Sequence, residues 1–241
     1  MVIGRYIMKK IIIAIIVVLL VILIGFVTYV ANKTVRINET DISDFTPIKN
    51  DAIADKYCPY IISNSEYEYP YAVYYRASVD DRGNTYIAYH YFWEREVNNT
   101  KGFVPWLSRN IYTGGLKLQK IMFGKHDIEV IGIVLDKNNK IIKVIYESPE
   151  NYSPNDFSVK HKTNEITQNI TLPLRFKVVS WNHLFQHVDN NYELQKGEVE
   201  LFVKPKYFTQ ALWDEFTMFK KEETALKQNR AHYLWEREYV Q

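Results

Sequence analysis

Alternating apolar and polar positions predict two β-hairpins. The first joins residues 71–79 to residues 85–93 through the turn Asp80-Asp81-Arg82-Gly83-Asn84. The second joins the run of residues 130–135 to residues 141–147 through Asp136-Lys137-Asn138-Asn139-Lys140. Short loops rich in Asn, Asp and Gly between β-branched or aromatic runs are typical of hairpins. The run of residues 130–135 is apolar on both faces, so this strand is expected inside a sheet and not at its edge.

The remaining pattern adds two strands and a helix. Residues 172–181 and 197–203 have strand character. From Pro205 to about residue 238 the pattern is helical, because Phe208, Leu212, Phe216 and Phe219 follow one another at spacings of four and three. The predicted fold class is mainly β (α+β): an antiparallel sheet or β-sandwich with a C-terminal helix, preceded by one N-terminal transmembrane helix.

The strongest single pattern is the uncharged run from Ile11 to Val30. About 20 apolar residues at 1.5 Å each cross the ~30 Å hydrocarbon layer of a membrane. Arg5, Lys9 and Lys10 precede the run, which predicts a cytoplasmic N-terminus and an extracytoplasmic main domain in the cell membrane. The alternative is a cleaved signal peptide, but its apolar region is only about 7–15 residues long, so an uncleaved signal-anchor fits better.

These patterns divide the chain into five parts. Polar residues without clear periodicity follow the apolar run and are typical of a tether, and we expect the C-terminal helix to pack on the sheet. The predicted order is a cytoplasmic N-terminus (1–10), a transmembrane anchor (11–31), a tether (32–55), a β-rich extracytoplasmic domain (56–204) and the C-terminal helix (205–241).

Composition narrows the function classes. The net charge of +2 over 241 residues gives no field that would attract nucleic acid. Cys58 is the only cysteine, so an intrachain disulfide and a paired-cysteine metal site are excluded, and Cys58 is expected to be a small buried residue. The 19 tyrosines favour half-buried strand faces.

The candidate site lies where the first strand of the second hairpin begins. Asp127 and Glu129 are two residues apart and share a face of the strand, and Glu129 is followed on that face by Ile131. A buried carboxylate must be paired, hydrogen-bonded or bound to a metal. With His126 beside them, the two carboxylates predict a site for a hard divalent cation such as Ca²⁺ or Mg²⁺. Two other interpretations are an acid/base pair, and neutralisation by Lys125 and an arginine. Later histidines that could complete a ligand set are His161, His183 and His187.

Two segments resemble the necrosis-inducing protein family. Residues 86–96 are similar to its Tyr-rich strand that ends in acidic residues. Lys125-His126-Asp127-Ile128-Glu129 is similar to the end of its Gly-His-Arg-His-Asp-Trp-Glu motif, with Ile for Trp. Gly124 stands where the family has its metal-binding histidine. The resemblance implies a secreted β-sandwich that holds a divalent cation and acts on membrane glycolipids. It also implies that Asp127 and Glu129 are cation ligands and that Glu94 or Glu96 lies near the family's upstream acid.

Two functions remain. The chain has no Gly-rich phosphate loop and no Gly-x-Ser-x-Gly elbow, and the pair His183 and His187 lacks the glutamate of a zinc-protease motif. We therefore expect a membrane-anchored, non-enzymatic binding or scaffolding domain whose partner is a protein or an envelope glycan, and no nucleic acid. The alternative is a divalent-metal-dependent hydrolase or a glycan or lipid binder that uses the Asp/Glu/His cluster.

Overall fold

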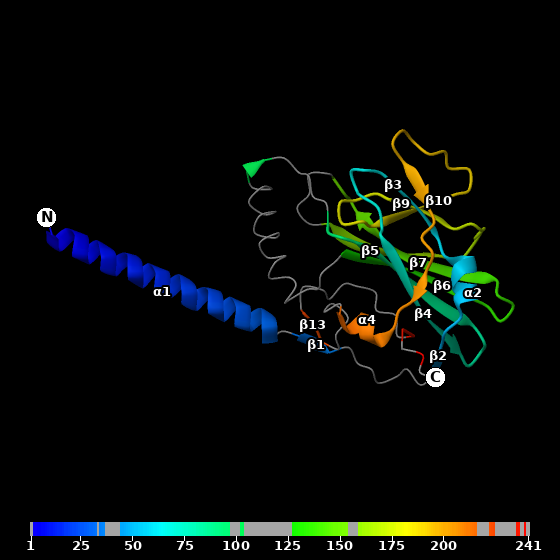
Figure 1. Cartoon of the computed structure of the whole chain (residues 1–241), viewed down its shortest axis with the longest axis horizontal. Coiled ribbons are helices and arrows are strands. Elements are labelled where there is room, and N and C mark those ends of the chain that lie inside the picture. Colours follow the sequence, from blue (N-terminus) through cyan, green and yellow to red (C-terminus); the bar gives the residue numbers. More distant parts are fainter. Residues whose placement is uncertain are drawn as a thin grey trace. The chain divides into compact units, whose positions relative to one another are not determined.

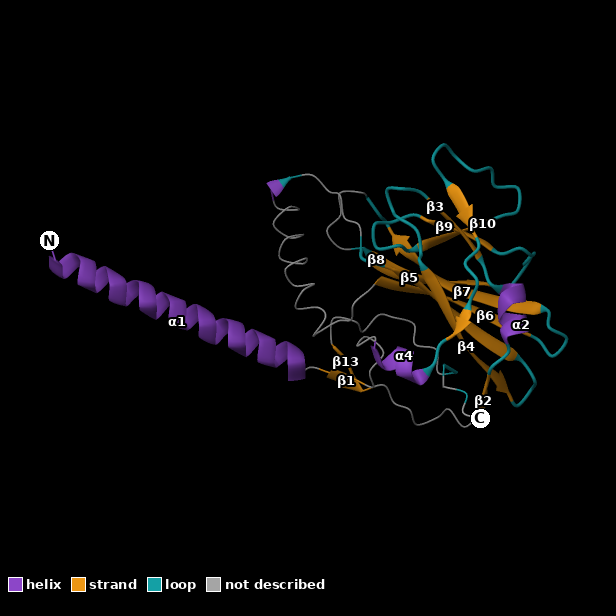
Figure 2. Cartoon of the chain, viewed as in Figure 1, coloured by secondary structure: helices purple, strands orange, loops and turns teal. Residues whose placement is uncertain are grey.

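The chain forms two units, and the larger one is mainly β. The computed structural model describes residues 2–32, 34–36, 44–96, 102–103, 127–153, 159–215, 222–224, 235–236 and 239. One unit comprises Met1–Ile37 and Phe219–Arg230, and the other comprises Asn38–Met218 and Ala231–Gln241. Figures 1 and 2 show the helices and strands of both units.

The smaller unit contains the predicted membrane helix. Helix α1 runs over Val2–Asn32, and its segment Met8–Gly25 is long and apolar enough to cross a membrane. The side chains in this segment are exposed, as a lipid-facing helix requires. Strand β1 (Thr34–Arg36) follows and pairs antiparallel with β13 (Glu222–Thr224). The N-terminal helix predicted from the apolar run is thus confirmed.

The larger unit is built on a seven-stranded sheet. Its strands are β2 (Phe45–Ile48), β4 (Ala72–Asp80), β5 (Thr85–Trp93), β6 (Asp127–Leu135), β7 (Ile141–Glu150), β8 (Lys160–Ile166) and β12 (Lys206–Tyr207). The order is β12-β4-β5-β6-β7-β8, and β2 also pairs with β4. All pairs are antiparallel except β12 with β4. The two predicted hairpins are β4–β5 and β6–β7.

A four-stranded sheet shares its core with the larger sheet. Its order is β10-β9-β3-β11, with β3 at Tyr60–Ser63, β9 at Arg175–Val178, β10 at Phe185–Val188 and β11 at Val199–Leu201. Phe176 and Phe185 from this sheet lie in one buried cluster with Tyr89, Tyr91 and Ile131 of the larger sheet. The mainly β, largely antiparallel fold predicted from the alternation is therefore confirmed.

The polar positions of β4 and β5 are covered by C-terminal residues. The Phe208 ring contacts Tyr74 and Phe92, with centroids 5.2 and 5.7 Å away. His90 is fully buried, and its Nε2 lies 2.8 Å from a carboxylate oxygen of Glu236. Arg76 is buried beside them and donates hydrogen bonds to the carbonyl oxygens of Phe208 and Glu236. Both faces of these two strands are thus buried.

Two predicted boundaries differ from the structure. The tether predicted over residues 32–55 includes β2 and helix α2 (Asp51–Tyr57), and the Asn50 side chain caps α2 by accepting from the Ile53 N–H. The helix predicted over residues 205–241 is only the short α4 (Gln210–Glu215) in the described part of that range, where residues 206–207 and 222–224 are strands. At residues 206–208, strand pairing and the packing of Phe208 on the sheet override the helical spacing, while Phe216 and Phe219 lie outside the described residues.

The lone cysteine is a buried core residue. Cys58 is 4% exposed, and its Sγ lies 3.6 Å from the Tyr91 hydroxyl. Burial raises the pKa of Cys58 to about 12, so the thiol stays protonated near neutral pH and is a poor nucleophile.

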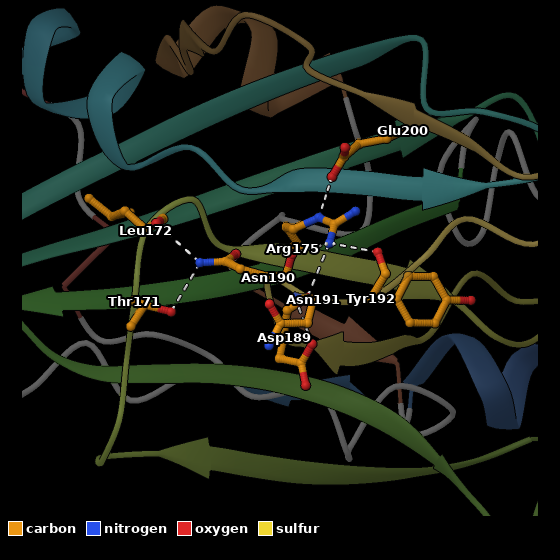
Figure 3. Close-up of polar contacts among 8 residues, drawn as sticks. All are labelled: Thr171, Leu172, Arg175, Asp189, Asn190, Asn191, Tyr192 and Glu200. Carbon is orange, nitrogen blue, oxygen red and sulfur yellow. Dashed lines mark hydrogen bonds and ion pairs between the residues drawn. The ribbon is translucent and has the colours of Figure 1, made fainter.

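A buried arginine fixes the loop after β10. Arg175 donates from Nε to Glu200 at 2.5 Å, and its Nη1 reaches the carbonyl oxygens of Asp189 and Tyr192, each at 3.1 Å (Figure 3). Asn190 donates in turn to Thr171 and Leu172 on the opposite segment. Arg175 therefore joins β9 to Glu200 on β11 and to the loop after β10, and Asn190 joins that loop to residues 171–172 before β9.

Candidate metal centre on strands β6, β7 and β8

Three neighbouring strands bring two carboxylates and one imidazole together. The cluster consists of Glu129 on β6, Glu147 on β7 and His161 on β8, and one ligand atom from each lies within 4.8 Å of the others. Glu129 and Glu147 are buried, at 3% and 8% exposed, and His161 is half-buried. Carboxylate oxygens and an imidazole nitrogen are common ligands of divalent cations in proteins. The cluster is therefore a candidate site for such a cation.

Strand alternation explains why Glu129 is buried. It precedes Ile131 and Ile133 on the face of β6 that lines the core. Its partner across the ladder on β5 is Tyr91, which is also buried. The ladder between β6 and β7 extends only to the pair Ile131 and Tyr146, so Glu129 lies beyond its end. The alternation of the sequence predicted this burial.

The charge of the cluster favours a cation. The two carboxylates offer oxygens within 4.8 Å of each other and repel each other when both are ionised, while Glu147 also accepts a hydrogen bond from His161. A divalent cation held between the two carboxylates would replace this repulsion with attraction to both. The cluster therefore has an electrostatic reason to bind one.

A chain of hydrogen bonds orients the imidazole of His161. The Leu184 N–H donates to the Ser180 hydroxyl at 3.0 Å, and this hydroxyl donates to the Asn182 side-chain oxygen at 2.7 Å. The Asn182 amide donates to His161 Nε2 at 3.1 Å, which places the ring proton on Nδ1, where it is donated to Glu147 at 2.6 Å. A cation bound at Nδ1 of the neutral imidazole requires that the ring proton move to Nε2 and that the Asn182 side chain turn its amide oxygen toward the ring to accept it. Such outer partners fix the orientation of a metal-binding histidine.

Asp127 has a different partner. Its carboxylate accepts a hydrogen bond from Nδ1 of His183 at 2.6 Å, and both side chains are buried. The imidazole of His183 is stacked on the indole of Trp93, with ring centroids 4.5 Å apart and an interplanar angle of 10°. Trp93 is the cross-strand neighbour of Asp127, so the β5–β6 register places these groups together. The arrangement is an oriented carboxylate–histidine pair beside the cluster.

The two predicted site carboxylates thus have different partners. Of the three predicted cation ligands, Glu129 lies in the cluster, Asp127 pairs with His183, and His126 lies outside the described residues. Glu94 and Glu96, which the family resemblance places near the upstream acid, follow the end of β5 and are not members of the cluster.

The sequence-based prediction included His161 among several candidate histidines but did not include Glu147 or Asn182. Glu147 breaks the apolar run of β7, and that break was a signal that the sequence contained. Nothing in the sequence linked Asn182 to His161. The remaining candidate, His187 on β10, is not a member of the cluster: its ring packs on Phe176 at 5.3 Å, and desolvation lowers its pKa.

Comparison with known proteins adds no relative. No protein-family model, no curated protein and no solved structure matches the chain. The geometry of the cluster and the apolar helix α1 are therefore the two features from which a function can be inferred.

Proposed function

We propose that the chain is a membrane-anchored, extracytoplasmic binding domain that holds a divalent cation at Glu129, Glu147 and His161. The observation that carries the proposal is the convergence of these three side chains from three strands within 4.8 Å, with both carboxylates buried. Carboxylates are seldom fully buried unless they are paired or bound to a metal. The support is therefore the placement of the charges and not a sequence motif.

The ligand set indicates which cations to expect. One imidazole and two carboxylates form a mixed nitrogen and oxygen set, which suits Zn²⁺ or Mn²⁺ better than the all-oxygen site expected for Ca²⁺ or Mg²⁺. Three protein ligands leave at least one coordination position open on a tetrahedral cation. This position would take water or an oxygen of the bound partner, for which an envelope glycan or a protein carboxylate has suitable chemistry.

Cation binding is tested on the full chain in detergent micelles. After treatment with a chelator and removal of the chelator, we expect one Zn²⁺ or Mn²⁺ to bind per chain and to stabilise it by about 2.7 kcal/mol at a hundred times the dissociation constant. Glu129→Gln and Glu147→Gln are each expected to remove most of this stabilisation, since each deletes a ligand charge. Metal content and thermal unfolding measure both effects.

A matched control comes from the same sheet. Glu165 on β8 is exposed and pairs with Lys143 at 3.1 Å, outside the cluster. Glu165→Gln should bind the cation as the unchanged chain does. A chain that binds no divalent cation, or a Glu129→Gln, Glu147→Gln double variant that still binds one tightly, would refute the proposed site.

The orientation rests on the positive-inside rule. Arg5, Lys9 and Lys10 lie at the start of α1 and predict that this end is cytoplasmic. Protease added to intact cells is then expected to cleave the larger unit, while a tag fused to Met1 stays protected until the cells are lysed. Protection of the larger unit in intact cells and its cleavage in inverted vesicles would show the opposite orientation.

A further inference from the structure

The Asp127–His183 pair holds an imidazole in an unusual environment. His183 is fully buried and has a φ of 60°, a left-handed conformation that is uncommon for residues other than glycine. Trp93 covers one face of the ring. Backbone, stacking partner and carboxylate together fix the ring in a single orientation.

That orientation leaves a buried lone pair without a hydrogen bond. Because Asp127 accepts from Nδ1, the neutral ring carries its proton on Nδ1, and its Nε2 is an acceptor. Nε2 of His183 is buried and has no hydrogen-bond partner, and the same is true of the indole N–H of Trp93. The two stacked rings thus present one unpaired acceptor and one unpaired donor. Native proteins keep few such atoms, and each of them requires an explanation.

Two short connections place the pair beside the cation cluster, one along β6 and one through Asn182. Asp127 and Glu129 are two residues apart on β6, which is about 7 Å along a strand. On the other side, His183 follows Asn182, whose amide contacts His161. His183 itself is not a member of the three-residue ligand group. It is therefore placed to contact a group that the cation carries and not the cation itself.

We propose that Nε2 of His183 accepts a hydrogen bond from an O–H group bound to the cation. This inference rests on the proposed function. The O–H belongs either to a water molecule or to a hydroxyl of a polyhydroxylated ligand such as a sugar, which share this chemistry. Asp127 is then a positioning residue: it keeps the proton on Nδ1 and so keeps Nε2 available as an acceptor.

The test uses the full chain in micelles with ¹⁵N-labelled histidine rings. The chain contains six histidines, and the resonances that disappear in His183→Asn assign this residue. Without metal we expect a protonated Nδ1 and an unprotonated Nε2. Zn²⁺ should shift the Nε2 resonance of His183 and leave its Nδ1 protonated. The resonance of the His161 ring nitrogen that binds Zn²⁺ should shift as well, because that nitrogen is a ligand of the metal.

A second arm identifies the source of the O–H group. Glucose is added to the Zn²⁺-loaded chain. A further shift of His183 Nε2 supports a ligand hydroxyl as donor, and an unchanged resonance supports water. If Zn²⁺ changes the resonances of His161 and leaves those of His183 unchanged, the inference is overturned and the cation site stands. If neither histidine responds, the cation site fails as well.

Variants give an independent measurement. Asn tolerates the left-handed backbone of residue 183, so His183→Asn preserves the turn but removes the acceptor. Loss of an outer-shell partner typically weakens metal binding by about 10–100-fold, and we expect a Zn²⁺ affinity reduced in that range. His187→Asn is the matched control and should leave the affinity unchanged. A folded His183→Asn variant with unaltered affinity overturns the inference. If that variant does not fold, the proximity of the His183 ring protons to those of Trp93 assigns the His183 resonances in the unchanged chain, and those spectra decide.

Discussion

Replacing Arg76 with methionine is expected to lower the free energy of unfolding of the larger unit by about 3–5 kcal/mol, the usual cost of removing one partner from a buried charged network. Arg76 is 2% exposed and holds three separate groups. It donates to the Phe208 carbonyl at 3.0 Å, to the Glu236 carbonyl at 2.8 Å and to the Gln210 side chain at 3.0 Å. Methionine fills similar space but leaves these acceptors unpaired.

The loss of the Arg76 hydrogen bonds is expected to destabilise the C-terminal residues most, because one of these bonds holds the Glu236 carbonyl. The Ser78 hydroxyl also donates to the Trp235 carbonyl, and the Trp235 ring lies 5.1 Å from Tyr86. These contacts and the contact between His90 and Glu236 must then hold the C-terminal residues on the sheet. We therefore expect Arg76→Met to increase hydrogen exchange of residues 235–236 before it affects the core strands.

Urea unfolding and hydrogen exchange of the full chain measure both effects. Arg82→Met is the control, because Arg82 is exposed in the turn between β4 and β5 and surface changes usually alter stability by about 0.5 kcal/mol or less. Equal stability of the Arg76→Met and Arg82→Met variants would show that the arginine contacts contribute little.

The hairpins could be predicted from the sequence because their determinants are local. Asp136 accepts hydrogen bonds from the N–H groups of Asn138 and Lys140, and Asp80 accepts from those of Arg82 and Asn84. Each turn is therefore specified by residues within five positions of one another. The alternation of β6 likewise predicted the burial of Glu129, since the side-chain period of a strand requires no knowledge of its neighbours.

The other parts of the candidate site and the C-terminal region depend on contacts between segments that are distant in the sequence. Glu147 meets His161 through the register of β7 and β8, and Asn182 reaches His161 from the turn between β9 and β10. Neither register nor turn position follows from a single sequence without homologues. The start of the C-terminal helix could not be predicted for the same reason: the helix begins at Gln210, because Phe208, despite its helical spacing with Leu212, packs its ring against Tyr74 and His90 of the sheet. Tertiary packing outweighed local periodicity there.

Trp93→Ala is expected to lower the free energy of unfolding by about 3–5 kcal/mol, the range for deleting a large buried aromatic ring. The indole is fully buried, lies 6.1 Å from the Phe185 ring and is stacked on His183. Its loss opens a cavity at the end of β5, where the core of the two sheets adjoins the candidate site. Trp93→Phe keeps an aromatic plane and should cost clearly less.

Comparison of Trp93→Ala with Trp93→Phe separates the effect of losing the ring surface from the effect of losing the indole N–H. Both remove the indole N–H, but only Trp93→Ala removes the surface on which the His183 imidazole rests. Leu194→Ala, at a side chain that is 45% exposed, should change stability by about 0.5 kcal/mol or less in the same urea titrations. If Trp93→Ala is no less stable than Leu194→Ala, the indole is not part of the core. If Trp93→Ala weakens Zn²⁺ binding more than Trp93→Phe does, the aromatic support of His183, and not the indole N–H, is what the site requires.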